Sequence, residues 1–156
     1  MCLFAIGDLH LPGGDEKPMD VFGPQWDGHF FRISEDWRQR VKPEDTVLIP
    51  GDISWAMQLQ DAIPDLQAIG ELPGKKILLK GNHDYWWSTA SKAMQLMQRL
   101  EIDSISFLNN NCFFYGDTAI CGTRGWFYEE SKGIEHDKKI MLRECMRLEA
   151  SLKAAG

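Results

Sequence analysis

Side chains that can bind a metal ion or move a proton follow three short apolar stretches of the chain. Residues 3–10 end in Gly-Asp-Leu-His, residues 46–52 end in Gly-Asp, and residues 81–84 are Gly-Asn-His-Asp. Together the three groups offer carboxylate, imidazole and amide atoms, which are common metal ligands and proton carriers. The sequence therefore predicts a metal-dependent or acid–base site if the three groups meet in space.

The stretches before these groups have the length and composition of buried β-strands. The runs 46–49 and 77–79 are short and almost entirely apolar, as in strands covered on both faces. In a parallel sheet, binding sites form beyond the carboxyl ends of the strands. We therefore expect an α/β fold, a layered β-sheet flanked by helices, with the three groups at one edge.

Each group taken alone has an ordinary structural explanation. An aspartate after a strand is commonly a turn residue or a helix cap. The functional interpretation depends on three groups in succession, each at a strand end and each carrying polar atoms of a different type.

Three helices are predicted between the strands. One covers residues 34–40 with Ser34 as its N-cap, another covers 61–70, and a third covers 88–100 with Ser88 as its N-cap. Short strands follow at 105–108, 112–115 and 118–121, and the last two are predicted to form a hairpin.

The last predicted helix spans residues 134–155. Apolar residues recur in it at alternating steps of four and three, which predicts that they face the core. These residues are Met141, Cys145, Leu148, Leu152 and Ala155, and the face opposite them contains Lys138, Lys139, Arg143, Glu144 and Lys153.

A long connection rich in glycine and proline follows His10. Loops of this length are usually functional lids or disordered segments. The aromatic residues Phe22, Trp26, Phe30 and Phe31 give this one apolar material for docking. We expect an ordered flap at residues 11–33, beside the site.

The composition excludes several classes of protein. With 156 residues and 44% hydrophobic residues, the chain can bury a core as one domain. The net charge is −6 and basic residues are scattered, so an extended nucleic acid is not an expected partner. The four cysteines form no metal-binding pair and are expected to be reduced and mostly packed. No signal peptide or membrane span is apparent, which predicts a cytoplasmic protein without membrane contact.

The three groups resemble the motifs of the calcineurin-like metallophosphoesterase superfamily, and the match looks closest to its bacterial predicted phosphohydrolases. Both the order of the motifs and their placement after strands match. The resemblance covers the whole chain in outline, as the N-terminal half of an αββα sandwich. It implies hydrolysis of a phosphate ester on a small phosphorylated substrate by a hydroxide bound to two metal ions.

The resemblance also implies a ligand for each metal ion. Asp8 and His10 would bind the first ion, Asp52 would bridge both, and Asn82 would bind the second. Oxygen donors with one or two imidazoles suit Mn²⁺, Fe or Zn²⁺.

In the same resemblance His83 protonates the leaving alkoxide and Asp84 orients His83. A histidine suits this role because its ordinary pKa lies near neutral pH.

The superfamily also has a further strand-end histidine and a Gly-His-x-His element, which this sequence lacks. The resemblance therefore implies that residues 1–156 lack the C-terminal strands of the fold. It also implies that they are weakly active or inactive by themselves, whereas the complete enzyme is active. A non-catalytic binding or scaffold module and a nuclease are the alternatives. The oligomeric state is left open.

Two other residues are candidates for substrate binding. Arg124 lies between glycines after a strand, where a guanidinium can hold a phosphate, although a surface salt bridge is the simpler expectation. Four aromatic residues follow the second and third groups and could stack on a flat leaving group, with core packing as the alternative: Trp55, the best candidate, and Tyr85, Trp86 and Trp87. His29 and His136 are expected to be solvated or hydrogen-bonded rather than metal ligands.

Overall fold

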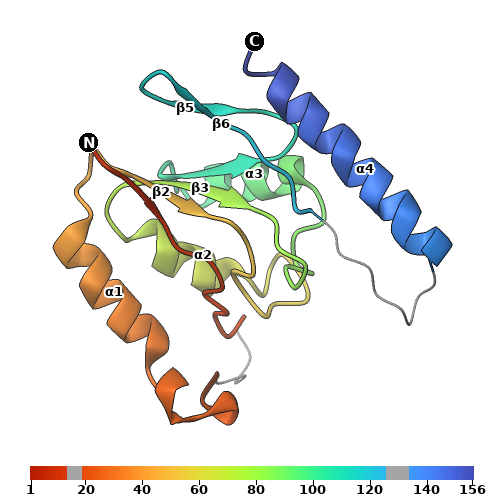
Figure 1. The fold of residues 1–156 in the computed structure, drawn as a ribbon. Helices are drawn as coiled ribbons and strands as arrows, with labels where there is room; N and C mark the ends of the chain where they lie inside the picture. The colour runs from red at the N-terminus through yellow and green to blue at the C-terminus, as the bar shows by residue number, and fades with distance from the viewer. Residues whose placement is uncertain (14–18, 126–133) are drawn as a thin grey trace. The chain divides into compact units, whose positions relative to one another are not determined.

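The computed structural model (Figure 1) describes residues 1–13, 19–125 and 134–156. The chain forms two compact units, Met1–Phe107 and Leu108–Gly156. Four strands make one sheet in the order β1 (Leu3–Ala5), β2 (Thr46–Ile49), β3 (Lys75–Leu79) and β4 (Ile105–Leu108). The pairs β1–β2 and β2–β3 are parallel, so the carboxyl ends of these strands lie at one edge. The predicted α/β class and the bounds of β2 and β4 are confirmed.

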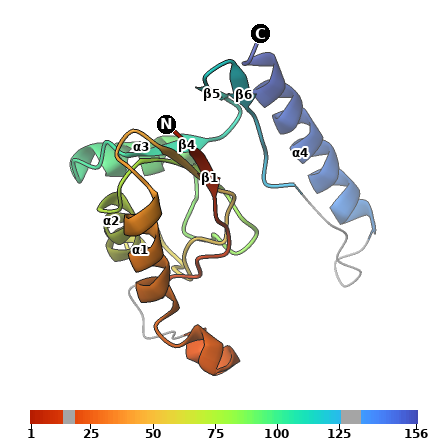
Figure 2. The same cartoon turned by 60° about the vertical axis from the view of Figure 1, so that its left-hand side comes forward.

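The strands are joined by helices α1 (His29–Arg40), α2 (Ile63–Gly70) and α3 (Ala90–Arg99). Neighbouring strands are consecutive in the chain, and crossovers between parallel strands are right-handed. A right-handed crossover from β1 to β2 and again from β2 to β3 places α1 and α2 on the same face of the sheet. Figure 2 shows all three helices on one side of β1.

Two helix starts differ from the prediction. α1 already begins at His29, and Ser34 is a buried residue inside it rather than its cap. α3 is capped by Thr89, whose hydroxyl oxygen accepts a hydrogen bond from the Lys92 amide at 3.3 Å, and not by Ser88. The sequence offers Ser88 and Thr89 side by side, and propensity does not choose between two hydroxyl residues.

The apolar faces of these helices pack on the sheet and form the core of the first unit. Side chains from every layer take part, and nearly all of them are fully buried. Large members of this cluster are Trp37, Val47, Ile49, Leu66, Ile69, Leu78, Trp86, Trp87, Leu96 and Phe107. This core fixes the strand ends on which the polar groups lie.

The expected flap is partly described, because residues 14–18 lie outside the described part of the chain. Two short 3₁₀ helices follow them, Met19–Phe22 and Pro24–Trp26. Met19 is buried, and its sulfur accepts a hydrogen bond from the indole nitrogen of Trp55 at 3.2 Å. The described part of the segment is thus in contact with the loop that follows β2.

The second unit contains the predicted hairpin, β5 (Phe113–Tyr115) with β6 (Thr118–Ile120), and the long helix α4 (Ile134–Lys153). The prediction of which face of α4 is buried is wrong. Leu148 and Leu152 are 39% and 55% exposed, whereas Glu144 and Ser151 are buried.

Hydrogen bonds explain why the polar face of α4 is inside. The Ser151 hydroxyl donates to the Asn111 carbonyl at 2.6 Å and accepts from the Gly122 amide at 3.1 Å. The Glu144 carboxylate accepts a hydrogen bond from the Thr123 hydroxyl. The helix is therefore attached to the chain around the hairpin by polar contacts.

All four cysteines are free thiols, as expected, but Cys2 and Cys145 are exposed rather than packed. In the described part of the chain, no helix is both long enough and apolar enough to cross a bilayer.

Candidate metal centre

Three loops at the carboxyl edge of the sheet carry the predicted site residues. The first loop (residues 6–13) follows β1, the second loop (residues 50–56) follows β2, and the third loop (residues 80–88) follows β3. Since these strands are neighbours in the sheet, the loops leave it side by side. The predicted convergence of the three groups has a structural basis in this strand order.

The first and second loops continue the pairing of the strands beyond the sheet. A series of backbone hydrogen bonds of 2.8–3.1 Å joins them. They run from the Asp8 amide to Gly51, from the His10 amide to Asp52, from the Leu11 amide to Ile53, and from the Trp55 amide to Leu11. The residues that carry the polar side chains are therefore held in register with each other by their own backbones.

Three site residues have a backbone conformation that is rare for side chains other than glycine. The φ angles of Asp8, His10 and Asp52 are 56°, 44° and 51°. Left-handed conformations at such residues are strained and concentrate at functional sites, where the surrounding structure holds them in place. The strain at these positions supports a functional role for the loops independently of the side-chain chemistry.

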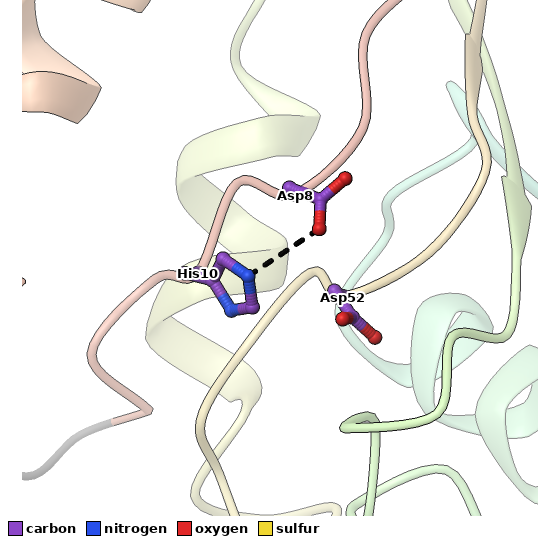
Figure 3. A group of neighbouring side chains, drawn as sticks. All are labelled: Asp8, His10 and Asp52. Atoms are coloured by element: carbon purple, nitrogen blue, oxygen red, sulfur yellow. Dashed lines mark ion pairs between the residues drawn. The ribbon is translucent and has the colours of Figure 1, made fainter.

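The side chains of Asp8, His10 and Asp52 meet at this edge (Figure 3), and their potential ligand atoms all lie within 4.8 Å of one another. Nε2 of His10 is 3.5 Å from a carboxylate oxygen of Asp8. The Asp8 side chain is 73% exposed, whereas those of His10 and Asp52 are 13% and 12% exposed. Two carboxylates and one imidazole, open to solvent on one side, fit a divalent cation.

His83 lies against the carboxylate of Asp52. Its amide donates to Oδ1 of Asp52 at 3.0 Å, and its Nδ1 is 2.8 Å from Oδ2. Burial by itself would raise the pKa of Asp52, but the hydrogen bonds from His83 and the neighbouring imidazoles outweigh it, and the pKa lies below its ordinary value. Asp52 is therefore ionised at neutral pH, as a metal ligand must be.

Asp84 has a different set of partners from the one predicted. Its carboxylate is fully buried and accepts hydrogen bonds from four backbone amides and one indole. The donors are the amides of Asp52, Ile53, Ser54 and Gly81 and the indole nitrogen of Trp86. Asp84 thus joins the second loop to the third, and the carboxylate hydrogen-bonded to His83 is that of Asp52.

The electrostatic environment of Asp84 reflects this arrangement. Burial raises the pKa of Asp84 above its ordinary value, and the hydrogen bonds from Gly81, Ile53, Trp86 and Ser54 oppose that rise. The carboxylate binds backbone amides. The motif Gly-Asn-His-Asp is compatible with this role and with orienting a histidine, so the sequence alone does not separate the two.

Aromatic rings line the centre. The Trp55 ring stacks on His10, with centroids 4.8 Å apart and an interplanar angle of 22°, and it also lies 5.5 Å from His83. Tyr85 meets His83 edge-on at 6.3 Å and is 56% exposed. Trp55 therefore contacts two imidazoles of the centre.

The other predicted residues are distributed as follows. The Asn82 side chain is exposed and lies against His83, with 3.2 Å between its Nδ2 and Nδ1 of His83. Arg124 lies in the second unit. His29 is hydrogen-bonded as expected, since its ring nitrogens lie 2.8 Å and 3.2 Å from the carbonyl oxygens of Leu9 and Trp26.

Sequence reasoning missed two residues next to the centre, Ser54 and Asp65. Asp65 is buried and accepts a hydrogen bond from the Ser54 hydroxyl at 2.5 Å. An aspartate in the first turn of a helix is ordinarily exposed to solvent and interacts favourably with the helix dipole. The position of Asp65 in the sequence therefore does not indicate a buried role. A buried neighbour pair of this kind becomes visible only when α2 is placed against the loops.

Comparison with known proteins decides the family. The family model described as calcineurin-like phosphoesterase matches residues 2–146. The chain belongs to the calcineurin-like phosphoesterases. No curated protein matches it. A solved structure, the protein of unknown function AQ665 from Aquifex aeolicus, is similar with 20% identity and a TM-score of 0.52, over 92% of this chain and 72% of that one. At this identity the likeness supports the fold alone.

Membership in the calcineurin-like phosphoesterases gives the centre a chemical context. The family indicates a metal-dependent hydrolase of phosphate esters and implies divalent metal ions. The cluster of Asp8, His10 and Asp52 is a candidate site for such an ion in this phosphoesterase.

Proposed function

We propose that the centre formed by the first three loops serves hydrolysis of the ester bond of a small phosphorylated substrate, with low turnover by this chain alone because it lacks the further histidine and the Gly-His-x-His element of the superfamily. The observation that carries the proposal is the convergence of Asp8, His10 and Asp52, with His83 in contact with Asp52. A bound pair of divalent ions would supply an activated water and neutralise the charge on the phosphate. Side chains of the protein would bind the ions, orient the reacting groups and donate a proton.

The proposed ligands divide between two ions. Asp8 and His10 would hold the first, Asp52 would be shared by both, and Asn82 would contribute to the second. The pKa of Asp52, lowered by His83 despite burial, keeps this shared carboxylate charged at neutral pH. Trp55 limits the rotation of the His10 ring by stacking on it, which supports one geometry for the first ion.

His83 is proposed to donate the proton that the leaving oxygen needs. Its Nδ1 faces Oδ2 of Asp52, and a carboxylate at this distance fixes the orientation of an imidazole ring. In this proposal Asp52 takes the orienting role first expected of Asp84. Trp55 and Tyr85 offer aromatic surfaces next to His83 for the leaving group, and Arg124 remains a proposed phosphate-binding residue.

We further propose that the protein is a cytoplasmic phosphatase and that its metal is Mn²⁺, with Fe or Zn²⁺ as alternatives. Carboxylate and imidazole ligands support these metals. The net charge of −6 supports a small substrate held by metal ions over an extended nucleic acid.

The test is replacement of His83 by alanine, with bound metal and hydrolysis measured on the same samples. Mn²⁺-dependent turnover of a generic phosphomonoester and of a phosphodiester is compared for each variant. We expect turnover at saturating Mn²⁺ to fall by about 10²- to 10⁴-fold, the usual contribution of a general acid, with the same metal content reached at saturation. The exposed His136 of α4 provides the matched control, His136→Ala, which should retain full turnover. Loss of metal from His83→Ala would contradict the role assigned to His83.

A further inference from the structure

Asp65 of α2 connects two of the loops that carry the proposed metal ligands. Its Oδ2 accepts one hydrogen bond from the Gly13 amide of the first loop, at 2.8 Å, and another from the Ser54 hydroxyl of the second loop, at 2.5 Å. Asp65 is 5% exposed, so both bonds are shielded from water. A single carboxylate oxygen thereby ties both loops to one helix.

The two contacts lie close to the ligands in the chain. Gly13 is in the same loop as His10, and Ser54 is in the same loop as Asp52. The loops touch at this point, because a Cβ on Gly13 would lie 2.3 Å from the Ala56 amide nitrogen, and Gly13 has a φ of +74°. No other residue fits there without displacing the second loop.

Ser54 is held from two sides. Its amide donates to the buried carboxylate of Asp84 at 3.3 Å, and its hydroxyl donates to Asp65. The same hydroxyl accepts from the Ala56 amide at 3.1 Å. The second loop is thus anchored by Asp84 toward the third loop and by Asp65 toward the first loop and α2.

Packing of α2 against the core does not by itself explain why position 65 is an aspartate. Leu66 and Ile69 of α2 are fully buried in the core, and a buried carboxylate costs free energy that an apolar residue there would not. What Asp65 adds is the pair of hydrogen bonds to the loops. Strained loops need such support, because Asp8, His10 and Asp52 keep their left-handed conformations only while their surroundings hold them.

We propose that Asp65 is a positioning residue of the metal centre, which sets metal affinity by clamping the first and second loops together against α2. The inference rests on the proposed function, since it concerns the same centre. Asp65 does not touch the ligands and acts on them through Gly13 and Ser54.

The test is Mn²⁺ affinity, measured by titration and by the Mn²⁺ electron paramagnetic resonance line shape, on folded protein. Asp65→Ala removes both hydrogen bonds, Ser54→Ala removes one, and Asp65→Asn keeps an acceptor oxygen in the same place. Loss of groups that support metal ligands typically weakens binding by about 10- to 100-fold. We expect a loss of that size for Asp65→Ala, a smaller loss for Ser54→Ala, substantial recovery in Asp65→Asn, and a changed line shape of the bound Mn²⁺ wherever affinity falls.

A double variant and a charge control separate clamping from other effects. If the two side chains act as one clamp, Ser54→Ala should add little further loss in the Asp65→Ala background. Asp61→Asn removes the same charge from an exposed position just before α2 and should leave the affinity within about twofold, as surface charges are screened. Circular dichroism and thermal melting establish the folded state, and Ser54→Ala decides the question if Asp65→Ala does not fold.

The outcomes distinguish the two proposals. Wild-type affinity and line shape in folded Asp65→Ala, or in Ser54→Ala if the former does not fold, would overturn the clamp and leave the proposed function intact. Failure of the wild-type chain to bind Mn²⁺ would overturn the proposed function and the clamp together. An equal loss in Asp61→Asn would assign the effect to charge and overturn the clamp.

Discussion

The two units of the molecule bury polar side chains for different purposes. In the first unit a large apolar core lies between the sheet and its helices, and the buried carboxylates Asp65 and Asp84 accept hydrogen bonds from the loops at the strand ends. In the second unit Glu144 and Ser151 attach α4 to the chain around the hairpin, while Leu142 and Leu152 are exposed.

This difference shows where an apolar pattern determines packing. A helix that lies on a sheet buries its apolar face because area removed from water stabilises the fold, as in α2 and α3. A helix held through side-chain hydrogen bonds to backbone groups can turn its polar face inward, as α4 does. Substitutions in the two units test this distinction.

The largest expected effect is that of Asp84→Ala in the first unit. It would leave four amides and the Trp86 indole without their shared buried acceptor. We expect the free energy of unfolding to fall by about 3 to 5 kcal/mol, measured by urea denaturation. Asp61→Ala, at an exposed position, should change it by less than about 0.5 kcal/mol. Similar small losses in both variants would remove Asp84 as an anchor.

A second prediction concerns Lys76, a fully buried residue of β3. Its ammonium group donates to the carbonyl oxygens of Gly70 and Leu72 at 3.2 Å and 2.5 Å, and burial lowers its pKa to about 8 from 10.5. Between these values the unfolded chain binds more protons than the folded one, so stability should rise with pH.

The rise attributable to Lys76 is about 3 kcal/mol between pH 8 and pH 10.5. It is measured as the difference in unfolding free energy between the wild-type chain and Lys76→Met across this range, which cancels the other titrating groups. A difference that stays constant with pH would show that Lys76 keeps an ordinary pKa in the folded chain.

A smaller effect is expected from Ser151→Ala in the second unit. This change removes the hydrogen bonds to Asn111 and Gly122, and it should lower the protection of α4 amides against hydrogen exchange by about 1 to 2 kcal/mol. Ser91→Ala in α3 is the matched control at an exposed helical position and should not lower protection there. Unchanged protection of α4 in Ser151→Ala would contradict the polar attachment.

The smallest effect is expected from Leu152→Gln, although its position in the apolar pattern predicts a core residue. Leu152 is 55% exposed, so a polar side chain of similar size should change the stability of α4 by less than about 0.5 kcal/mol. The same exchange at the fully buried Leu66 should cost several times more, as in other cores. A large loss of stability in Leu152→Gln would show that Leu152 lies on the buried face of α4, as the apolar pattern predicts.

Much of the first unit could be predicted from the sequence. Apolar runs located β2 and β4, and the Gly-Asp and Gly-Asn-His-Asp groups located the strand ends where Asp8, His10 and Asp52 meet. Both rest on local signals, namely strand composition and the geometry of parallel strands.

The unpredicted features depend on contacts between distant residues. Asp84 lies beside His83 in the sequence, but its partners are amides about thirty residues earlier in the chain and the nearby Gly81. Asp65 gives no local sign that it meets Gly13 across the fold. The inner face of α4 was mispredicted because hydrophobic periodicity does not record hydrogen bonds to the loops around a hairpin.

The left-handed conformations of Asp8, His10 and Asp52 also limit how this centre can be transplanted. A short peptide containing the motif of either loop would relax to an ordinary conformation, since each such residue costs of order 1 to 3 kcal/mol without a supporting scaffold. Grafting the ligands onto another protein would therefore require the paired loops and their two buried aspartates as one piece. The smallest portable unit is a piece of folded architecture, not a sequence motif.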